Sequence, residues 1–457
     1  MPGRSARGAP ERRLSSGGAE GLASQRSFAA APARKVGGSL RIPGDKSISH
    51  RSLMLSAVAR GRSRVTGFLD SEDCLATLGA MRAMGVRIER PDATTVIVEG
   101  AAAAGLKAPA ADLDMGNAGT AIRLSLGLLA GQPFTSRLVG DASLSRRPME
   151  RVAVPLRSMG ARIETTDGHP PVIVRGGAPL HGIRHALPVA SAQVKSALLL
   201  AGLYADGVTD LTEPSATRDH TERMLRGFGV DVIQDGRRVQ LTGPARLTAC
   251  DVTVPADFSS AAFFLVAGCL ADEGELQLEG VGVNPTRTGL LEILGRMGAR
   301  IEIANERTSG GEPIADLIVH PAELHGIEVP EHLVSLAIDE FPVLFVAAAC
   351  ASGETVVTGA AELRVKESDR IGAMAEGLRG LGIEVEPRPD GMRVRGGQLS
   401  GGRVDSHGDH RIAMAFAIAS LRATGPLEIL DTANVATSFP RFVALARQAG
   451  LELEERS

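Results

Sequence analysis

The feature that most constrains the fold of this chain is a long internal repeat marked by glycines. Apolar stretches of helical length end near six glycines, which follow one another at intervals of 67 to 79 residues: Gly61, Gly131, Gly207, Gly274, Gly353 and Gly425. Glycine often ends a helix because it adopts the left-handed conformation easily. A period near 70 residues therefore predicts six copies of one supersecondary unit.

A second series of glycines divides each unit. They follow the first series by 22 to 29 residues and end amphipathic patterns, as in MRAMGVRIE and LGRMGARIE: Gly85, Gly160, Gly229, Gly298, Gly382 and Gly450. Each unit thus consists of a strand, an apolar helix, a strand, an amphipathic helix and further strands. A helix that is apolar all round must be buried, so we expect an α/β fold with the apolar helices packed together inside the sheets.

The number of copies predicts two domains. Three copies fall before about Val252 and three after it, so we expect a first domain at 44–253 and a second at 254–457. The strand pattern at 38–42 precedes the first helix and could pair with the C-terminal half, so we assign 37–43 to the second domain. Residues 1–36 lack periodicity and are rich in Arg, Ser, Gly and Ala. We expect a disordered extension there, with a transit segment as the alternative.

Composition excludes several classes of function. A net charge of −3, a single tyrosine and no tryptophan argue against a nucleic-acid-binding protein. The longest uncharged apolar runs, 261–271 and 341–351, have about half of the ~20 residues that a membrane span needs. The four cysteines lie far apart and match no metal-binding spacing. We expect a cytoplasmic protein that binds neither nucleic acid nor membrane.

Polar residues gather where the apolar helices begin. GDKSISHR at 44–51 places Lys46, Ser47 and Arg51 in a first helical turn, where free N–H groups and the helix dipole favour an anion. The other starts are GNAGT (116–120), SAQVK (191–195), DFSS (257–260), DE (339–340) and DHR (409–411). Singly, such residues are usually helix caps. Six starts facing one cleft would form an anion site whatever the net charge.

Lysine is scarce, which draws attention to its positions. Of 50 basic residues only five are lysines, and Lys46, Lys195 and Lys366 lie at predicted helix starts. An ammonium group can exchange protons in a working pH range and a guanidinium cannot. A chemical role for these lysines is therefore a reasonable hypothesis.

Nine motifs in order resemble one known family. They are GDKSISHR (44–51), GNAGTAIR (116–123), SRRPM (145–149), ASAQVKSALLLAGL (190–203), TRDHTE (217–222), NPTRTG (284–289), LRVKESDR (363–370), GDHRIAMAF (408–416) and TSFP (437–440). Together they resemble the 3-phosphoshikimate 1-carboxyvinyltransferase (EPSP synthase) family over about residues 38–455, in the branch with TRDHT, LRVKESDR and TSFP. The resemblance implies two domains, each of three βαβαββ units in an inside-out α/β barrel with three buried parallel helices.

The same resemblance implies a reaction. The enolpyruvyl group of phosphoenolpyruvate would pass to the 5-hydroxyl of shikimate 3-phosphate, with release of phosphate, in the shikimate pathway of aromatic amino acid biosynthesis. No metal and no organic cofactor would take part, and we expect a monomer.

The resemblance also assigns site residues. Shikimate 3-phosphate would contact Lys46, Ser47, Arg51, Ser191, Ala192, Gln193, Arg218, Asp339 and Lys366. Phosphoenolpyruvate would contact Lys46, Asn117, Gly119, Arg147, Gln193, Lys366, Arg370, His410 and Arg411. Asp339 would accept a proton, while Lys366 and Glu367 would exchange protons with the ligand. The sequence leaves open which of these two protonates carbon, and His410 is expected to orient rather than titrate.

Three positions qualify the resemblance. Thr437 stands where many relatives carry a phosphoenolpyruvate-binding lysine, and Glu362 stands where others carry an asparagine that touches shikimate 3-phosphate, so neither contact is carried over. Gly119 is alanine in herbicide-tolerant members of this branch. We therefore expect glyphosate to compete with phosphoenolpyruvate here.

Two other functions were weighed. UDP-N-acetylglucosamine enolpyruvyl transferase shares the fold and one substrate, but it uses a cysteine after the second helix start, and 116–148 contains none. A non-catalytic phosphate-sensing repeat would keep the helix starts but would not need Asp339, Lys366 and Glu367.

Overall fold

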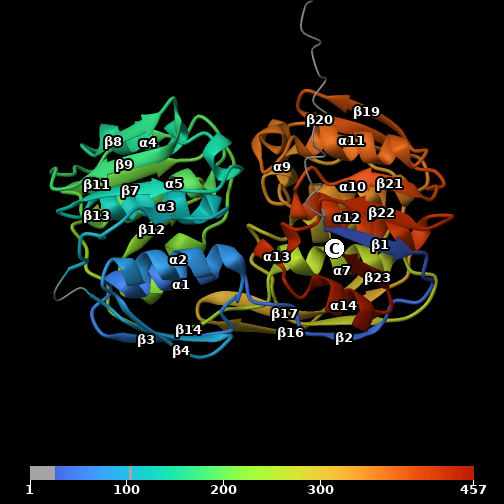
Figure 1. Cartoon of the computed structure of the whole chain (residues 1–457), viewed down its shortest axis with the longest axis horizontal. Helices are drawn as coiled ribbons and strands as arrows, with labels where there is room; N and C mark the ends of the chain where they lie inside the picture. Colours follow the sequence, from blue (N-terminus) through green and yellow to red (C-terminus); the bar gives the residue numbers. More distant parts are fainter. Residues whose placement is uncertain (1–25, 102–104) are drawn as a thin grey trace, which may run out of the picture.

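The computed structural model describes residues 26–101 and 105–457. Two lobes lie side by side and are joined along one end, the first coloured blue to green and the second mostly yellow to red (Figure 1). Buried apolar side chains form two clusters, one from residues 48–254 and the other from 28–42 together with 256–453. We take each cluster as the core of one domain and propose a boundary near Pro255.

Six sheets enclose these cores. In the first domain the strand orders are β14 (Val252–Thr253), β3 (Arg62–Thr66), β5 (Thr95–Glu99), β4 (Arg87–Asp92); β6 (Leu113–Asp114), β7 (Thr135–Val139), β9 (His169–Arg175), β8 (Arg162–Thr166); and β10 (Arg184–Ala186), β11 (Gly207–Thr212), β13 (Arg238–Gly243), β12 (Val232–Asp235). In the second they are β16 (Arg300–Ser309), β17 (Glu312–His320), β15 (Leu276–Gly282), β2 (Gly38–Leu40); β18 (Glu354–Val357), β20 (Gly391–Arg395), β19 (Glu384–Arg388); and β21 (Gly402–Asp405), β22 (Leu427–Leu430), β1 (Ser27–Ala31), β23 (Glu452–Arg456).

The six apolar runs form the buried helices, as predicted. They are α1 (Lys46–Val58), α3 (Gly119–Ala130) and α5 (Ala192–Gly202) in the first domain, and α7 (Phe258–Leu270), α10 (Phe341–Cys350) and α12 (His410–Ala419) in the second. α3 packs against α1 and α5, and α7, α10 and α12 pack against one another. The amphipathic runs form α2 (Glu72–Ala83), α4 (Glu150–Ser158), α6 (His220–Gly227), α8 (Gly289–Arg296), α11 (Arg370–Gly380) and α14 (Phe442–Ala449). Within the described part of the chain, no helix has the length and apolar character needed to cross a membrane.

The repeat glycines have two different causes. All of the second series, from Gly85 to Gly450, have a positive φ, as expected for left-handed helix ends. In the first series Gly131 and Gly425 do not, so a left-handed conformation does not explain them. At Gly131 the reason is space, because a Cβ atom there would lie 2.2 Å from the ring of Tyr204.

The chain passes between the domains twice, and the two passages run side by side. Gly44 bridges Ala256 in antiparallel fashion, and the backbone N–H of Asp45 donates to the carbonyl of Pro255 at 2.8 Å. A side chain at Gly44 would meet the carbonyl oxygen of Gly67 at 1.8 Å, so the close approach of this backbone to Gly67 requires glycine. Strand β2 pairs in parallel with β15 of the C-terminal half, the half with which it was expected from the sequence to pair. Strand β14 pairs in parallel with β3 of the first domain.

The predicted disordered extension is wrong for residues 26–36. β1 lies between β22 and β23 and pairs antiparallel with both, and Phe28 stacks on Phe442 with ring centroids 6.2 Å apart. The sequence SFAAA has no alternation that marks a strand, and its conformation comes from pairing with strands about 400 residues later. Residues 1–25 of the predicted extension lie outside the described residues.

Candidate active site

A cavity of about 780 Å³ lies between the domains, and residues at the starts of all six buried helices line it. The predicted site residues that line it are Lys46, Ser47, Asn117, Gly119, Arg147, Ser191, Ala192, Gln193, Arg218, Asp339, Lys366, Glu367, Arg370, His410 and Arg411. Motifs spread over most of the chain are thus brought to one surface. Among the predicted site residues the exception is Arg51, which does not line the cavity.

Arg51 and Lys195 lie behind the wall of the first domain. Arg51 is buried and donates to the carbonyl of Ser47 at 2.9 Å, so it supports the start of α1 from within. The ammonium of Lys195 is buried between Glu213 and Glu222, with 2.8 Å to each carboxylate. Of the three lysines at helix starts, only Lys46 and Lys366 therefore face the cavity.

Lys46 is held from both domains. Its backbone N–H donates to Asp257 at 3.2 Å, and its ammonium contacts Asp73 at 3.0 Å and Ser438 at 2.8 Å. Ser438 belongs to α13 (Val435–Ser438) of the TSFP motif. Thr437 instead donates to the carbonyl of Asn434 within that helix at 2.8 Å. The TSFP motif thus contributes the hydroxyl of Ser438, which contacts Lys46. The residue singled out from the sequence, Thr437, directly precedes it.

The start of α3 supports a polar cluster around Arg147. The guanidinium of Arg147 donates to Asn117 Oδ1 at 2.5 Å. A Cβ atom at Gly119 would lie 2.9 Å from Nη1 of Arg147, so glycine here lets the arginine lie against the helix start. Gln193 accepts from Arg123 at 2.8 Å and donates to Thr120 at 3.0 Å. These bonds fix which end of the Gln193 amide is the acceptor.

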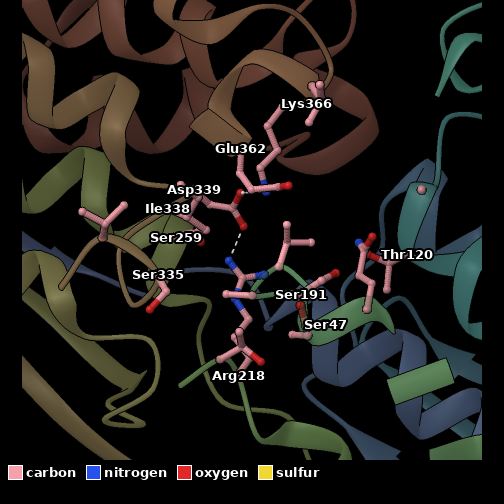
Figure 2. Close-up of a pocket in the computed structure, with 18 of the residues that line it drawn as sticks. Ser47, Thr120, Ser191, Arg218, Ser259, Ser335, Ile338, Asp339, Glu362 and Lys366 are labelled. Carbon is pink, nitrogen blue, oxygen red and sulfur yellow. Dashed lines mark hydrogen bonds and ion pairs between the residues drawn. The ribbon is translucent and has the colours of Figure 1, made fainter. Parts of the chain in front are cut away.

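Asp339 lies at the centre of the cavity wall. Arg218 of the first domain points toward its carboxylate, and Lys366 lies on the other side of it (Figure 2). Lys366 Nζ is 3.3 Å from Asp339 Oδ1, Arg370 is at 3.4 Å and Arg411 at 3.9 Å. Burial alone would raise the pKa of Asp339, but the four positive charges outweigh it and hold the pKa well below its usual value.

Glu367 forms a second anionic centre beside Asp339. It contacts Arg147 across the cleft at 3.2 Å and Arg370 at 2.5 Å. Burial opposes ionisation, yet Arg370 and Arg147 hold the pKa of Glu367 well below its usual value. Arg370 itself is 1% exposed and also donates to Asp409, the N-cap of α12, at 2.8 Å.

His410 is a buried, neutral imidazole. Burial lowers its pKa to about 3, and the nearby charge of Lys46 acts in the same direction. A histidine with this pKa does not change its charge near neutral pH. The low pKa agrees with the expectation that His410 does not titrate, and its role in orienting a ligand stays a prediction.

Sequence reasoning missed several residues that line the cavity. Asp73, Arg123, Arg151, Ser259 and Arg287 received no role, although each lies in its wall. Arg123 and Arg287 both belong to motifs quoted above. The four-residue spacing from Gly119 to Arg123 would have placed Arg123 on the same helix face as Gly119. Nothing local marks Asp73 or Arg151, whose roles arise from contacts distant in sequence.

Comparison with known proteins decides the family. The family model described as EPSP synthase (3-phosphoshikimate 1-carboxyvinyltransferase) matches residues 30–445. The chain belongs to the EPSP synthase family. A relative from Methylococcus capsulatus, named 3-phosphoshikimate 1-carboxyvinyltransferase, is 61% identical over 428 residues, covering 93% of this chain and 98% of the relative. The resemblance inferred from the nine motifs is thereby confirmed.

Solved structures of EPSP synthase agree with this fold. The enzyme from Acinetobacter baumannii is 54% identical, with a TM-score of 0.85, and the match covers 94% of this chain and all of that one. The enolpyruvyl transferase NikO from Streptomyces tendae, at 20% identity and a TM-score of 0.76 over 94% of this chain and 99% of its own, shares the fold. The predicted two-domain α/β class is confirmed.

Arg370 pairs with three carboxylates, so its contribution to the free energy of unfolding should depend on pH. Arg370→Gln should destabilise the protein by about 3 kcal/mol at pH 7, because buried carboxylates lose their cation. The carboxyls of Asp339, Glu367 and Asp409 have lowered folded-state pKa values, so their ionised forms stabilise the fold above pH ~4 and this stabilisation is lost as pH falls. The difference between wild type and variant should therefore narrow from pH 7 toward pH 3.

Denaturant unfolding followed by far-ultraviolet circular dichroism measures this difference, since the chain has no tryptophan. Arg379→Gln on the same helix is the matched control, because its guanidinium donates to the carbonyl of Val385 at 2.9 Å. Its effect should not depend on pH. An Arg370→Gln penalty that is equal at both ends of the pH range would contradict the assignment.

Proposed function

We propose that this chain transfers the enolpyruvyl group of phosphoenolpyruvate to the 5-hydroxyl of shikimate 3-phosphate and releases phosphate. The observation that carries the proposal is the position of Asp339, an ionised carboxylate between a cation of the first domain and three of the second. Two anionic substrates that meet in this cavity would find a base between their binding groups. From the sequence we also expect a monomer that acts in the cytoplasm.

We assign shikimate 3-phosphate to the first-domain side of the cavity. Its proposed contacts are Lys46, Ser47, Ser191, Ala192, Gln193, Arg218, Asp339 and Lys366. Arg218 and the free N–H groups at the start of α5 suit the phosphate. Arg51 would act through Ser47, whose carbonyl it holds from behind.

We assign phosphoenolpyruvate to the region between Arg147 and the starts of α11 and α12. Its proposed contacts are Lys46, Asn117, Gly119, Arg147, Gln193, Lys366, Arg370, His410 and Arg411. Guanidinium groups from two sides can each make paired hydrogen bonds to a carboxylate or phosphate. The protein's own carboxylates partner these arginines in the described structure, so the substrate would take over those contacts.

The proposed mechanism needs three proton transfers. The oxygen of the 5-hydroxyl attacks C2 of phosphoenolpyruvate while its methylene carbon gains a proton, and the tetrahedral intermediate then loses phosphate and a proton from the new methyl group. Asp339 would accept the hydroxyl proton. Glu367 is ionised between Arg147 and Arg370 and carries no proton to give, so we assign protonation of carbon to the ammonium of Lys366. The neutral amine left on Lys366 would then take back the proton that the new methyl group loses as phosphate departs.

The first test is release of phosphate from phosphoenolpyruvate by the purified full chain. Phosphate should appear only when shikimate 3-phosphate is added, because the acceptor hydroxyl is required for release. UDP-N-acetylglucosamine is the control acceptor and should give none. Phosphate release that is independent of the acceptor, or no release at all, would contradict the proposal.

Two variants separate the proposed roles. Lys366→Met should lower kcat by a factor of about 10² to 10⁴, since it removes a proton carrier and a ligand charge. Arg218→Ala should instead raise KM for shikimate 3-phosphate roughly 10- to 100-fold, the loss expected for a charged hydrogen bond. Steady-state kinetics with each substrate varied distinguishes them. Equal modest defects in both would mean that the division of roles is wrong.

Gly119 offers a test of inhibitor recognition. Glyphosate should compete with phosphoenolpyruvate in the wild type. Gly119→Ala should raise its inhibition constant by about tenfold or more, because a methyl group here would contact Arg147 and crowd the ligand beside it. Inhibition kinetics against phosphoenolpyruvate measures both values. An unchanged inhibition constant would exclude Gly119 from the inhibitor site.

A further inference from the structure

Another ion pair crosses the cleft beside the one between Arg147 and Glu367. Arg151 of α4 contacts Glu362 of η2 (Ala361–Val365), with 3.0 Å between Nη1 and Oε2. The two side chains are 23% and 31% exposed, and both line the cavity. Neither residue has a role in the substrate contacts proposed above.

The surroundings of Arg151 are strongly positive. Arg123, Arg147 and Arg151 share the first-domain wall of the cavity. Burial lowers the pKa of Arg123 to about 9, and the charges of Arg151 and Arg147 contribute to this lowering. The facing wall of the second domain carries two carboxylates. Glu367 pairs with Arg147, and Glu362 pairs with Arg151.

Glu362 is a negative charge in a cavity that must take up anions. Without a partner, its carboxylate would repel an incoming carboxylate or phosphate, or it would compete for Arg147. Its position in the chain matters too, because η2 ends at Val365 and Lys366 follows directly. A contact that fixes Glu362 against α4 therefore also fixes the backbone that carries Lys366.

We propose that Arg151 and Glu362 form a positioning pair across the cleft: Arg151 neutralises Glu362 and holds the segment before Lys366 against the first domain. The proposal rests on the proposed function, since it concerns binding of phosphoenolpyruvate at that site. A partly exposed ion pair contributes little to stability. The effect of the pair should therefore appear in kinetics and not in unfolding.

The test is a double-mutant cycle on the full chain. Arg151→Gln leaves Glu362 uncompensated and should raise KM for phosphoenolpyruvate about tenfold. Glu362→Gln removes the repelling charge and should change that KM by less than about threefold. The double variant Arg151→Gln/Glu362→Gln should resemble Glu362→Gln, so that the second substitution rescues the first.

A charge exchange strengthens the test. Arg151→Glu should be severely impaired, because it places a second carboxylate opposite Glu362, and Arg151→Glu/Glu362→Arg should recover at least about tenfold in kcat/KM. Arg157→Gln is the matched control: it lies on the same helix, pairs with Glu150 and does not line the cavity, so KM should not change. Thermal unfolding should be similar for all variants.

Additive losses in the cycle, with no recovery on exchange, would overturn the proposal and would indicate that Arg151 contacts the substrate directly. Failure of the proposed function would show elsewhere, in a wild-type protein that releases no phosphate from phosphoenolpyruvate with shikimate 3-phosphate. The two results are therefore distinguishable.

Discussion

The cleft depends on mutual neutralisation of buried charges. A buried cation or carboxylate without a partner is costly, and most buried charges at this site are paired with an opposite one, while Arg123 donates to Gln193 and to the carbonyl of Pro148. Arg370, which is 1% exposed, contacts Asp339, Glu367 and Asp409. The starts of six helices add partial positive charge at the same place. The wall of the cavity thus carries cations that can bind anions, and in the described structure the protein's own carboxylates pair with these cations.

Under the proposed function, this arrangement would link substrate binding to proton transfer. Substrate carboxylate and phosphate groups would replace protein carboxylates as partners of Arg147, Arg218 and Arg370. Asp339 would then feel less positive charge, and its pKa would rise from its lowered value, which makes it a better proton acceptor when both substrates are present. The ionised carboxylate of Asp339 and its surrounding cations are consequently parts of one electrostatic unit.

The two passages between the domains connect this unit to the fold. Asp45 and Asp257 cap α1 and α7, and the backbone of Lys46 donates to Asp257 across the boundary. Arg287 lies between these caps, 3.8 Å from Asp45 and 3.5 Å from Asp257. Burial would lower the pKa of Arg287, but the surrounding carboxylates raise it above its usual value. One buried guanidinium thus ties helix starts of both domains together at the edge of the cavity.

The sequence by itself determined the repeat, the six buried helices, the family and a set of site residues of which all but Arg51 line the cavity. These follow from local patterns: helix periodicity, glycine at helix ends and short motifs at helix starts. Only the tertiary structure decided that SFAAA is a strand, that Ser438 holds Lys46, that Arg51 and Lys195 face inward, and that Arg151 meets Glu362. Each of these depends on partners distant in the chain, and the pairing of distant segments leaves no periodic signal in either one.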